Sequence, residues 1–400
     1  MQKNLKWYRP SMQFKFGIEH EVAFQTENGQ YVDFSNTSFE SLQAIVDDLP
    51  LYDEDYPQLR VGDAGIKKKR WYIEGFERFD EAGELTGCIP KGLEIRTRIH
   101  DSIHAAVEEL TASFEKMADV AREHGYFPVL SSYNPLQPTF KPYPPLNVFE
   151  KARRNASPEK QTAFIPMMTQ GPDLNISRSG LSTRALVDFA QKLTYYSPFI
   201  VPFTFSAPFY KGKLWEGLSK RSYERTGLRP AAMVFLEKDV SKYSVVPSLV
   251  KPARIASEVG RVEFKACDSC GDFNLYGALL ALMKGMLLDK QLAGRAAVPD
   301  EKKHKETALV GFEDPLIHQQ AGLVLAAARR ALEHDPDCAW LSHLDALHAA
   351  RSCQAREMKY AFNQNFNLID VLAAGYSFSN RITEPSLNQV PLQMASKNKK

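Results

Sequence analysis

The segment from residue 12 to 24 carries the pattern that most constrains the fold of this chain. It reads Met-Gln-Phe-Lys-Phe-Gly-Ile-Glu-His-Glu-Val-Ala-Phe, and apolar side chains recur at every second position except where His20 interrupts them. Such alternation is typical of a strand that buries one face. We therefore expect a strand whose packed face includes His20 and whose other face carries the carboxylates of Glu19 and Glu21.

Other segments predict further strands and helices by their periodicity, caps and turn residues. The expected elements are a tight turn at Asn28-Gly29 leading into Tyr31 and Val32, a hairpin from Arg70 to Ile99 that turns near Glu81 to Glu84, a helix from Asp101 or Ser102 to Gly125, an irregular Pro-rich loop from Asn134 to Asn147, a helix start at Ser157, extended runs at Leu174 to Ser177 and Arg261 to Ala266, helices at Ser182 to Tyr196 and Asp272 to Leu292, and a helix-rich region from Glu301 to Asn363. No repeat or compositional break divides the chain, so we expect one α+β domain over residues 1–380 and a loose polar tail over 381–400.

Composition excludes several classes of protein. The 400 residues include 50 Lys and Arg against 48 Asp and Glu, and 44% are hydrophobic, which disfavours both a disordered chain and a nucleic-acid-binding polycation. No stretch reaches the roughly 18 apolar residues that span a bilayer. The polar first ten residues and five cysteines predict a cytoplasmic protein without a membrane partner. The short basic run at 67–70 predicts either a solvated loop or an anion-attracting patch.

Glu19 and Glu21 lie two residues apart on the predicted strand, so their Cβ atoms share one face at a separation of roughly 6 to 7 Å. Paired carboxylates on a rigid strand suit divalent magnesium, which prefers oxygen ligands and usually retains water or substrate phosphate. A solvated strand face beside Lys15 is the alternative for an isolated pair of this kind.

Two more predicted strands repeat this polar theme. Glu94 and Arg96 alternate with buried residues, and Glu263 and Lys265 do the same further along the chain. If the polar faces line one concave sheet, carboxylates can hold metal ions while arginine and lysine meet phosphate oxygens, as phosphoryl transfer requires. The alternative is a set of ordinary surface ion pairs.

Five motifs, in order over roughly residues 17 to 290, resemble the glutamate-cysteine ligase and carboxylate-amine ligase superfamily. They are Gly17-Ile18-Glu19-His20-Glu21, Gly92-Leu93-Glu94-Ile95, the Met-rich run Met167 to Ser177, the segment Ser219 to Gly227, and Gly260 to Asp268. The resemblance implies a fold like the catalytic domain of glutamine synthetase: a curved, mainly antiparallel sheet with helices packed on one side.

The resemblance also implies roles for individual residues. Magnesium, or manganese, is expected at Glu19, Glu21, Glu94, Asp173 and Glu263. Arg221, Arg225 and Lys265 are the expected catalytic cations, and Arg96, Arg221 and Lys265 are expected to bind ATP. Two positions depart from the family pattern: Asp173 stands where relatives use Gln or His, and Lys265 replaces an arginine and so lacks its planar fork.

The implied function is ATP-dependent ligation, in which the γ-carboxylate of glutamate is activated as an acyl phosphate and joined to the amino group of cysteine, as in glutathione biosynthesis. Free carboxylate does not react with amines at neutral pH, and no covalent enzyme nucleophile is needed. One alternative is a ligase that joins the acid to another amino acid or an alkylamine. Another is an inactive nucleotide-binding regulator, although four retained carboxylates argue against it. The oligomeric state is left open.

Overall fold

The computed structural model describes residues 13–55, 70–238 and 240–376. Within these ranges, nine strands form one sheet: β1 (Phe14–Thr26), β2 (Tyr31–Val32), β3 (Trp71–Phe79), β4 (Leu85–Arg96), β5 (Tyr126–Val129), β6 (Pro172–Arg178), β9 (Ala232–Leu236), β10 (Val250–Pro252) and β11 (Val262–Phe264). The remaining strands, β7 (Phe209–Tyr210) and β8 (Lys213–Leu214), pair with each other. The expected tail at 381–400 and the basic residues 67–69 lie outside the described ranges.

The long strand β1 is the centre of the sheet. The strand order is β10-β9-β11-β6-β1-β4-β3, and β2 and β5 pair with the second half of β1. Every pairing is antiparallel except that of β9 with β10. The expected hairpin of β3 and β4 and the strand at β6 are confirmed, and Gly29 supplies the positive φ of the turn after β1.

Helices lie between the sheet strands and make up most of the described chain after β11. They are α1 (Phe39–Asp48), α2 (Ile103–Glu123), α3 (Val148–Asn155), α4 (Pro158–Gln161), α5 (Phe164–Met168), α6 (Thr183–Ile200), α7 (Lys220–Arg225), α8 (Phe273–Leu288), α9 (Glu301–Val310), α10 (Pro315–Ala331), α11 (Leu341–Ala349), α12 (Gln354–Asn363) and α13 (Leu368–Ala373). Serine caps begin α2 and α6, where Ser102 and Ser182 each accept a backbone N–H, and Gly125 follows the end of α2 at positive φ.

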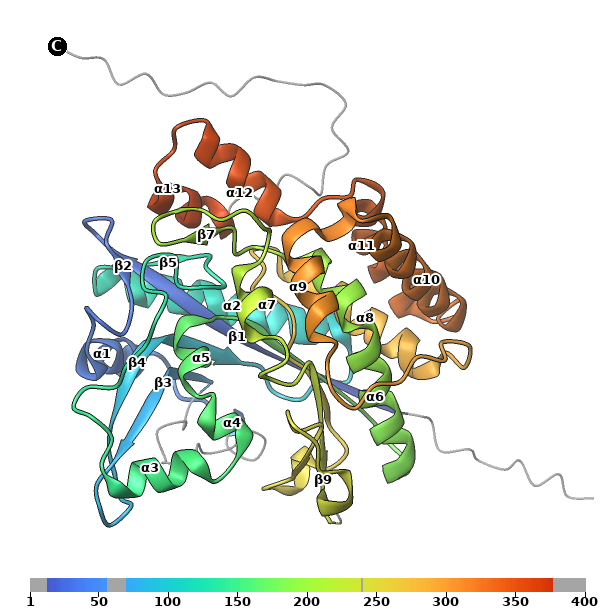
Figure 1. Cartoon of the computed structure of the whole chain (residues 1–400), viewed down its shortest axis with the longest axis horizontal. Coiled ribbons are helices and arrows are strands. Elements are labelled where there is room, and N and C mark those ends of the chain that lie inside the picture. Colours follow the sequence, from blue (N-terminus) through green and yellow to red (C-terminus); the bar gives the residue numbers. More distant parts are fainter. Residues whose placement is uncertain (1–12, 56–69, 239, 377–400) are drawn as a thin grey trace, which may run out of the picture.

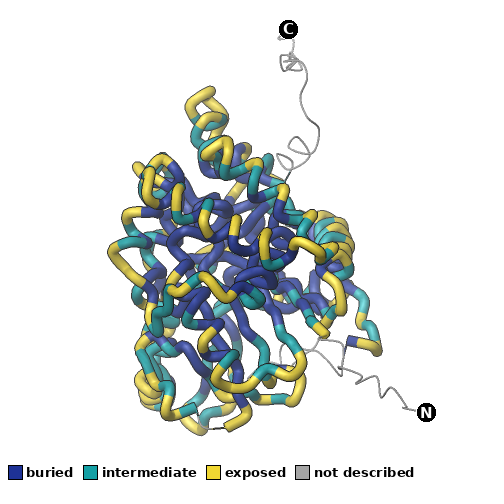
Figure 2. Tube along the Cα trace, turned by 90° about the vertical axis from the view of Figure 1, so that its right-hand side faces the viewer, coloured by how far each residue is buried: buried dark blue, intermediate teal, exposed yellow. Residues whose placement is uncertain are grey.

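The main apolar core lies between one face of the sheet and the long helices. Helices α2 and α8 pack against β1 and β6, respectively, and α6 packs against β9 and β11. Helices α3 and α5 contact β3, and α4 contacts α3 (Figure 1). The chain trace through the middle of the molecule is buried, and exposed segments lie at its periphery (Figure 2). Among the described helices, none combines the length and apolar character needed to cross a membrane.

His20 lies on the apolar face of β1, as its position in the alternating pattern predicts. Its side chain is fully buried, and its two ring nitrogens lie 3.0 Å from the Tyr276 hydroxyl and 3.1 Å from the Tyr376 hydroxyl. Burial lowers the pKa of His20 to about 3, so the ring is neutral at pH 7. This packing leaves the opposite face of β1 to Glu19 and Glu21.

Candidate active site

The register of four neighbouring strands brings the predicted carboxylates onto one face of the sheet. Glu21 on β1 lies directly opposite Glu94 on β4, and Glu19 lies opposite Asp173 on β6. Glu263 is on β11, the next strand after β6. Residues more than 240 positions apart in the sequence therefore share one polar surface.

This polar surface forms the floor of a cavity of about 390 Å³. The far wall comes from α5, α7 and the segment around β10. All nine residues expected to bind metal, ATP or substrate line this cavity: Glu19, Glu21, Glu94, Arg96, Asp173, Arg221, Arg225, Glu263 and Lys265. Their proximity is observed, and their individual roles stay predictions.

One end of the cavity holds three carboxylates within reach of a single cation. Oxygens of Glu21, Glu74 and Glu94 lie within 4.8 Å of one another. Glu21 is fixed from two sides: the Lys91 ammonium lies 2.8 Å from its Oε1, and the Gly171 N–H donates to its Oε2 over 2.8 Å. Because Mg²⁺ and Mn²⁺ take oxygen ligands and usually keep several waters, this donor set fits a divalent cation.

The other carboxylates are already paired with cations of the chain. The Lys265 ammonium contacts both Asp173 and Glu263, and Arg261 lies 3.1 Å from Glu263 and 3.6 Å from Glu19. Burial and the two neighbouring carboxylates raise the pKa of Asp173, although Lys265 opposes the shift. Burial disfavours the charged form of Glu19, but Arg261 and a hydrogen bond with Glu94 outweigh it and lower the pKa of Glu19.

Arg221 and Arg225 project from the short helix α7, and Arg229 follows shortly after it. Burial, followed by repulsion from Arg221 and Arg229, lowers the pKa of Arg225 well below its usual value. In the described part of the chain, neither Arg225 nor Arg229 forms an ion pair. Arg225 donates to the Pro230 carbonyl, and Arg229 donates to the Glu159 carbonyl and the Thr162 hydroxyl. Among the described residues, no carboxylate lies within ion-pair distance of these two guanidinium groups.

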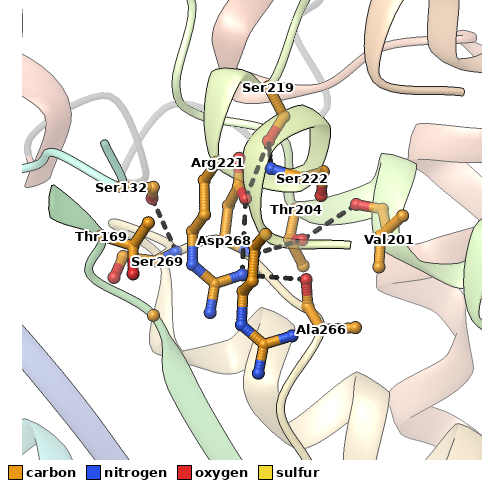
Figure 3. A network of polar contacts seen from close by, with 12 residues as sticks. Ser132, Thr169, Val201, Thr204, Ser219, Arg221, Ser222, Ala266, Asp268 and Ser269 are labelled. Atoms are coloured by element: carbon orange, nitrogen blue, oxygen red, sulfur yellow. Dashed lines mark hydrogen bonds and ion pairs between the residues drawn. The ribbon is translucent and has the colours of Figure 1, made fainter. Parts of the chain in front are cut away.

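A buried polar network fixes α7 and Arg221 (Figure 3). The Ser219 hydroxyl caps α7 by accepting the Ser222 N–H over 2.9 Å, and donates to Asp268 over 2.9 Å. Arg221 donates to the carbonyls of Ala266 and Lys265, and its Nη1 lies 3.8 Å from Asp268. Burial raises the pKa of Asp268 to about 6. Arg221 is thus anchored by the loop that follows β11.

Arg96 lies opposite Glu19 in the sheet, and its guanidinium stands over the Tyr72 ring at 4.7 Å. Arg96 also lines the cavity. The predicted position of Arg96 beside the carboxylates is therefore observed.

Sequence reasoning missed Glu74, Arg229 and Lys251, which line the cavity, and Lys91, which contacts Glu21. Glu74 had a usable signal, because Tyr72 pairs with Glu94 across the hairpin and Glu74 shares its face. Arg261, which the alternating pattern places on the same strand face as Glu263, also lines the cavity. Lys91 had no such signal, because it acts by binding the carbonyls of Pro166 and Thr169, distant in sequence.

No family model matches this chain, and no curated protein matches it. Two solved structures share its fold, and its mainly antiparallel sheet with helices packed against one face confirms the expected fold class. A bifunctional glutathione synthetase from Pasteurella multocida superposes with a TM-score of 0.61 at 14% identity, over 92% of this chain and 52% of that one. This chain thus spans about half the length of that enzyme. A glutamate-cysteine ligase from Francisella tularensis, in complex with AMP, gives a TM-score of 0.53 at 11% identity, over 92% of this chain and 89% of that one.

Proposed function

We propose that this protein is an ATP-dependent carboxylate-amine ligase that activates the γ-carboxylate of glutamate and joins it to the amino group of cysteine. The observation that carries the proposal is the division of charge in one cavity. Three carboxylates gather around Glu21, and Arg225 and Arg229, which form no ion pair within the described residues, line the same cavity.

This division suits phosphoryl transfer between two anions. ATP and a carboxylate substrate repel each other, so the site needs positive charge near both. A divalent cation held by Glu21, Glu74 and Glu94 would neutralise phosphate charge when bound. Arg225 and Arg229, with cationic groups in a buried setting, would hold the anionic substrate or the transferring phosphoryl group.

The proposed reaction has two steps. A γ-carboxylate oxygen forms a bond to the terminal phosphorus of ATP as the bond to ADP breaks, which yields an acyl phosphate. The amine then attacks the acyl carbon, the amide bond forms, and inorganic phosphate leaves with the original carboxylate oxygen while the amine loses a proton. The walls of the cavity would limit access of water to the acyl phosphate.

The choice of substrates rests on the resemblance and on the fold. The motifs resemble glutamate-cysteine ligases, and one structure of the same fold is a glutamate-cysteine ligase. The departures at Asp173 and Lys265 leave room for a different amine, which is the second candidate. An inactive nucleotide-binding regulator is the third, and the convergence of Glu21, Glu74 and Glu94 argues against it because mutually repelling carboxylates are costly to keep without a cation.

The proposal is tested by ADP release from ATP and Mg²⁺ with a panel of amino acids and amines. We expect slow release with glutamate alone and a marked acceleration when cysteine is added, with a γ-glutamyl product identified by mass. If another amine replaces cysteine, the ligase class stands and the acceptor assignment fails. If no acid triggers ADP release, the protein is not a ligase and the regulator alternative is favoured.

A further inference from the structure

The imidazole ring of His20 joins three parts of the fold on the apolar side of the sheet. Its Nδ1 atom lies 3.0 Å from the hydroxyl of Tyr276 on α8, and its Nε2 atom lies 3.1 Å from the hydroxyl of Tyr376 in the short helix η7 (Ala374–Tyr376). The Phe273 ring packs edge-on against it, with the ring centroids 5.0 Å apart. Both ring nitrogens therefore form hydrogen bonds in a buried, apolar environment, where such bonds are strong.

The hydrogen bonds of Tyr276 determine which nitrogen of His20 carries the ring proton. The Tyr276 oxygen accepts the backbone N–H of Cys270 over 2.8 Å. Its own hydroxyl proton has no acceptor among the described residues other than Nδ1 of His20, and a buried hydroxyl proton without an acceptor would be costly. Nδ1 is therefore the acceptor, so the ring proton is on Nε2 and is donated to the Tyr376 hydroxyl.

His20 lies between two of the predicted metal ligands on β1. Glu19 and Glu21 flank it in the sequence and line the cavity on the other face of the sheet. Because successive side chains of a strand point to opposite faces, a rotation of the backbone at His20 would displace both carboxylates. The hydrogen bonds that hold the His20 ring from α8 and η7 oppose this rotation.

The same hydrogen bonds reach the segment that anchors Arg221. Cys270 belongs to the segment between β11 and α8. In this segment the Ala266 carbonyl accepts a hydrogen bond from Arg221 (Figure 3). Tyr276 binds both Cys270 and His20, and so connects the anchor of Arg221 with the strand that carries the predicted metal ligands.

We propose that His20 is a positioning residue, which with its proton fixed on Nε2 keeps the carboxylates of β1 in a fixed position relative to Arg221. It acts through Tyr276 and Tyr376 and contacts no substrate, since its side chain lies on the buried face of β1. The catalytic part of this inference rests on the proposed function, because only a ligase gives these carboxylates and Arg221 a task in turnover.

The position of the proton is tested by nuclear magnetic resonance of protein labelled with ¹⁵N-histidine. The His20 signals are those that both Tyr276→Phe and Tyr376→Phe change. In wild type at pH 7 these signals should show an unprotonated Nδ1 and a protonated Nε2. A proton on Nδ1 would overturn the assignment, and the absence of any change in both variants would overturn the two hydrogen bonds.

The positioning role is tested with Tyr276→Phe, which removes the donor to His20 and keeps the packing of the ring. Tyr196→Phe is the matched control, because the buried Tyr196 hydroxyl also accepts a backbone N–H, that of Gly294, but does not line the cavity. We expect Tyr276→Phe to lower the kcat of ADP release by about tenfold. It should also speed hydrogen exchange in β1 and in the segment between β11 and α8. Tyr196→Phe should change neither, even if both variants lose similar stability.

The outcomes separate this inference from the proposed function. Equal kcat and equal exchange rates in the two variants would overturn the positioning role and leave the ligase proposal standing. If wild type releases no ADP with any acid, the ligase proposal fails, and hydrogen exchange with the proton position still decides whether His20 holds the two segments together. If Tyr276→Phe does not fold, Tyr376→Phe takes its place, with a lower kcat and faster exchange expected in β1.

Discussion

Gly171 lies where the backbone passes close to the Arg221 guanidinium. A Cβ atom at this position would lie 2.2 Å from Nη2 of Arg221 and 2.8 Å from the Cys267 carbonyl oxygen. The Gly171 N–H also donates to Glu21. The absence of a side chain at Gly171 therefore allows Arg221 and Glu21 to lie close to the same backbone segment.

We expect Gly171→Ala to lower the turnover of ADP release by about tenfold or more, because the methyl group must displace Arg221 or the backbone that holds Glu21. Gly87→Ala on β4 is the matched control, since a Cβ there meets no atom within 4 Å. Steady-state kinetics and thermal melting of both variants check the prediction. Equal turnover in the two variants would show that the close approach of Gly171 to Arg221 has no catalytic consequence.

Among the individual site residues, the sequence predicted those that follow a clear local pattern. It missed those whose position depends on partners far away in the sequence. Glu19, Glu21, Glu94 and Glu263 alternate with apolar neighbours, so their shared polar face could be inferred. Lys265 was expected to meet phosphate, but its place between Asp173 and Glu263 depends on the pairing of β11 with β6. That pairing follows from tertiary structure and not from spacing.

At the scale of elements, a buried carboxylate joins helix α2 to the end of strand β4. Glu109 on α2 accepts hydrogen bonds from the backbone and side chain of Arg98, and lies 2.6 Å from the His100 ring. Burial opposes its ionisation, but these contacts and Arg70 lower the pKa of Glu109 to about 2. The helix on which much of the core packs is thus tied to a strand of the site.

We expect Glu109→Gln to lower the free energy of unfolding by roughly 2 kcal/mol at pH 7. The folded pKa of about 2 lies below the ordinary value of 4.5, so the ionised carboxylate stabilises the fold above about pH 4.5. This stabilisation is lost as the pH falls toward 2, and the difference between variant and wild type should shrink in that window. Urea unfolding from pH 7 to pH 3 measures it.

Glu115→Gln is the control for this prediction, because Glu115 is an exposed residue of the same helix. It should change stability little at any pH. A Glu109→Gln deficit that stays constant between pH 7 and pH 3 would contradict the assigned pKa shift and would point to packing alone.

Helices and strands were predicted correctly where a periodic pattern of apolar residues extends over many positions. Short elements that follow a loop were missed. The strand β1, the hairpin β3–β4 and the helices α2, α6 and α8 were all expected. Helix α3 was not, although Asn147 and Glu150 form a capping box. The Pro-rich segment before it predicted an irregular loop up to Asn147, so no helix was expected directly after it. The apolar strand β9 also escaped, because five consecutive buried residues show no alternation.

For the molecule as a whole, the site is assembled from segments that span residues 15 to 265. The sheet face could be predicted because each strand carries its own polar pattern. The position of α7 could not, because the hydrogen bonds that hold it join residues far apart in the sequence, Ser219 with Asp268 and Arg221 with Ala266. A single domain over residues 1–380 remains a prediction.

The most direct test of the central claim follows oxygen from the acid to phosphate. Glutamate labelled with ¹⁸O in its γ-carboxylate is incubated with ATP, Mg²⁺ and cysteine, and the inorganic phosphate is analysed by mass. Activation as an acyl phosphate predicts that each turnover transfers one labelled oxygen into phosphate while a γ-glutamyl product forms. Unlabelled phosphate released alongside that product would contradict the account.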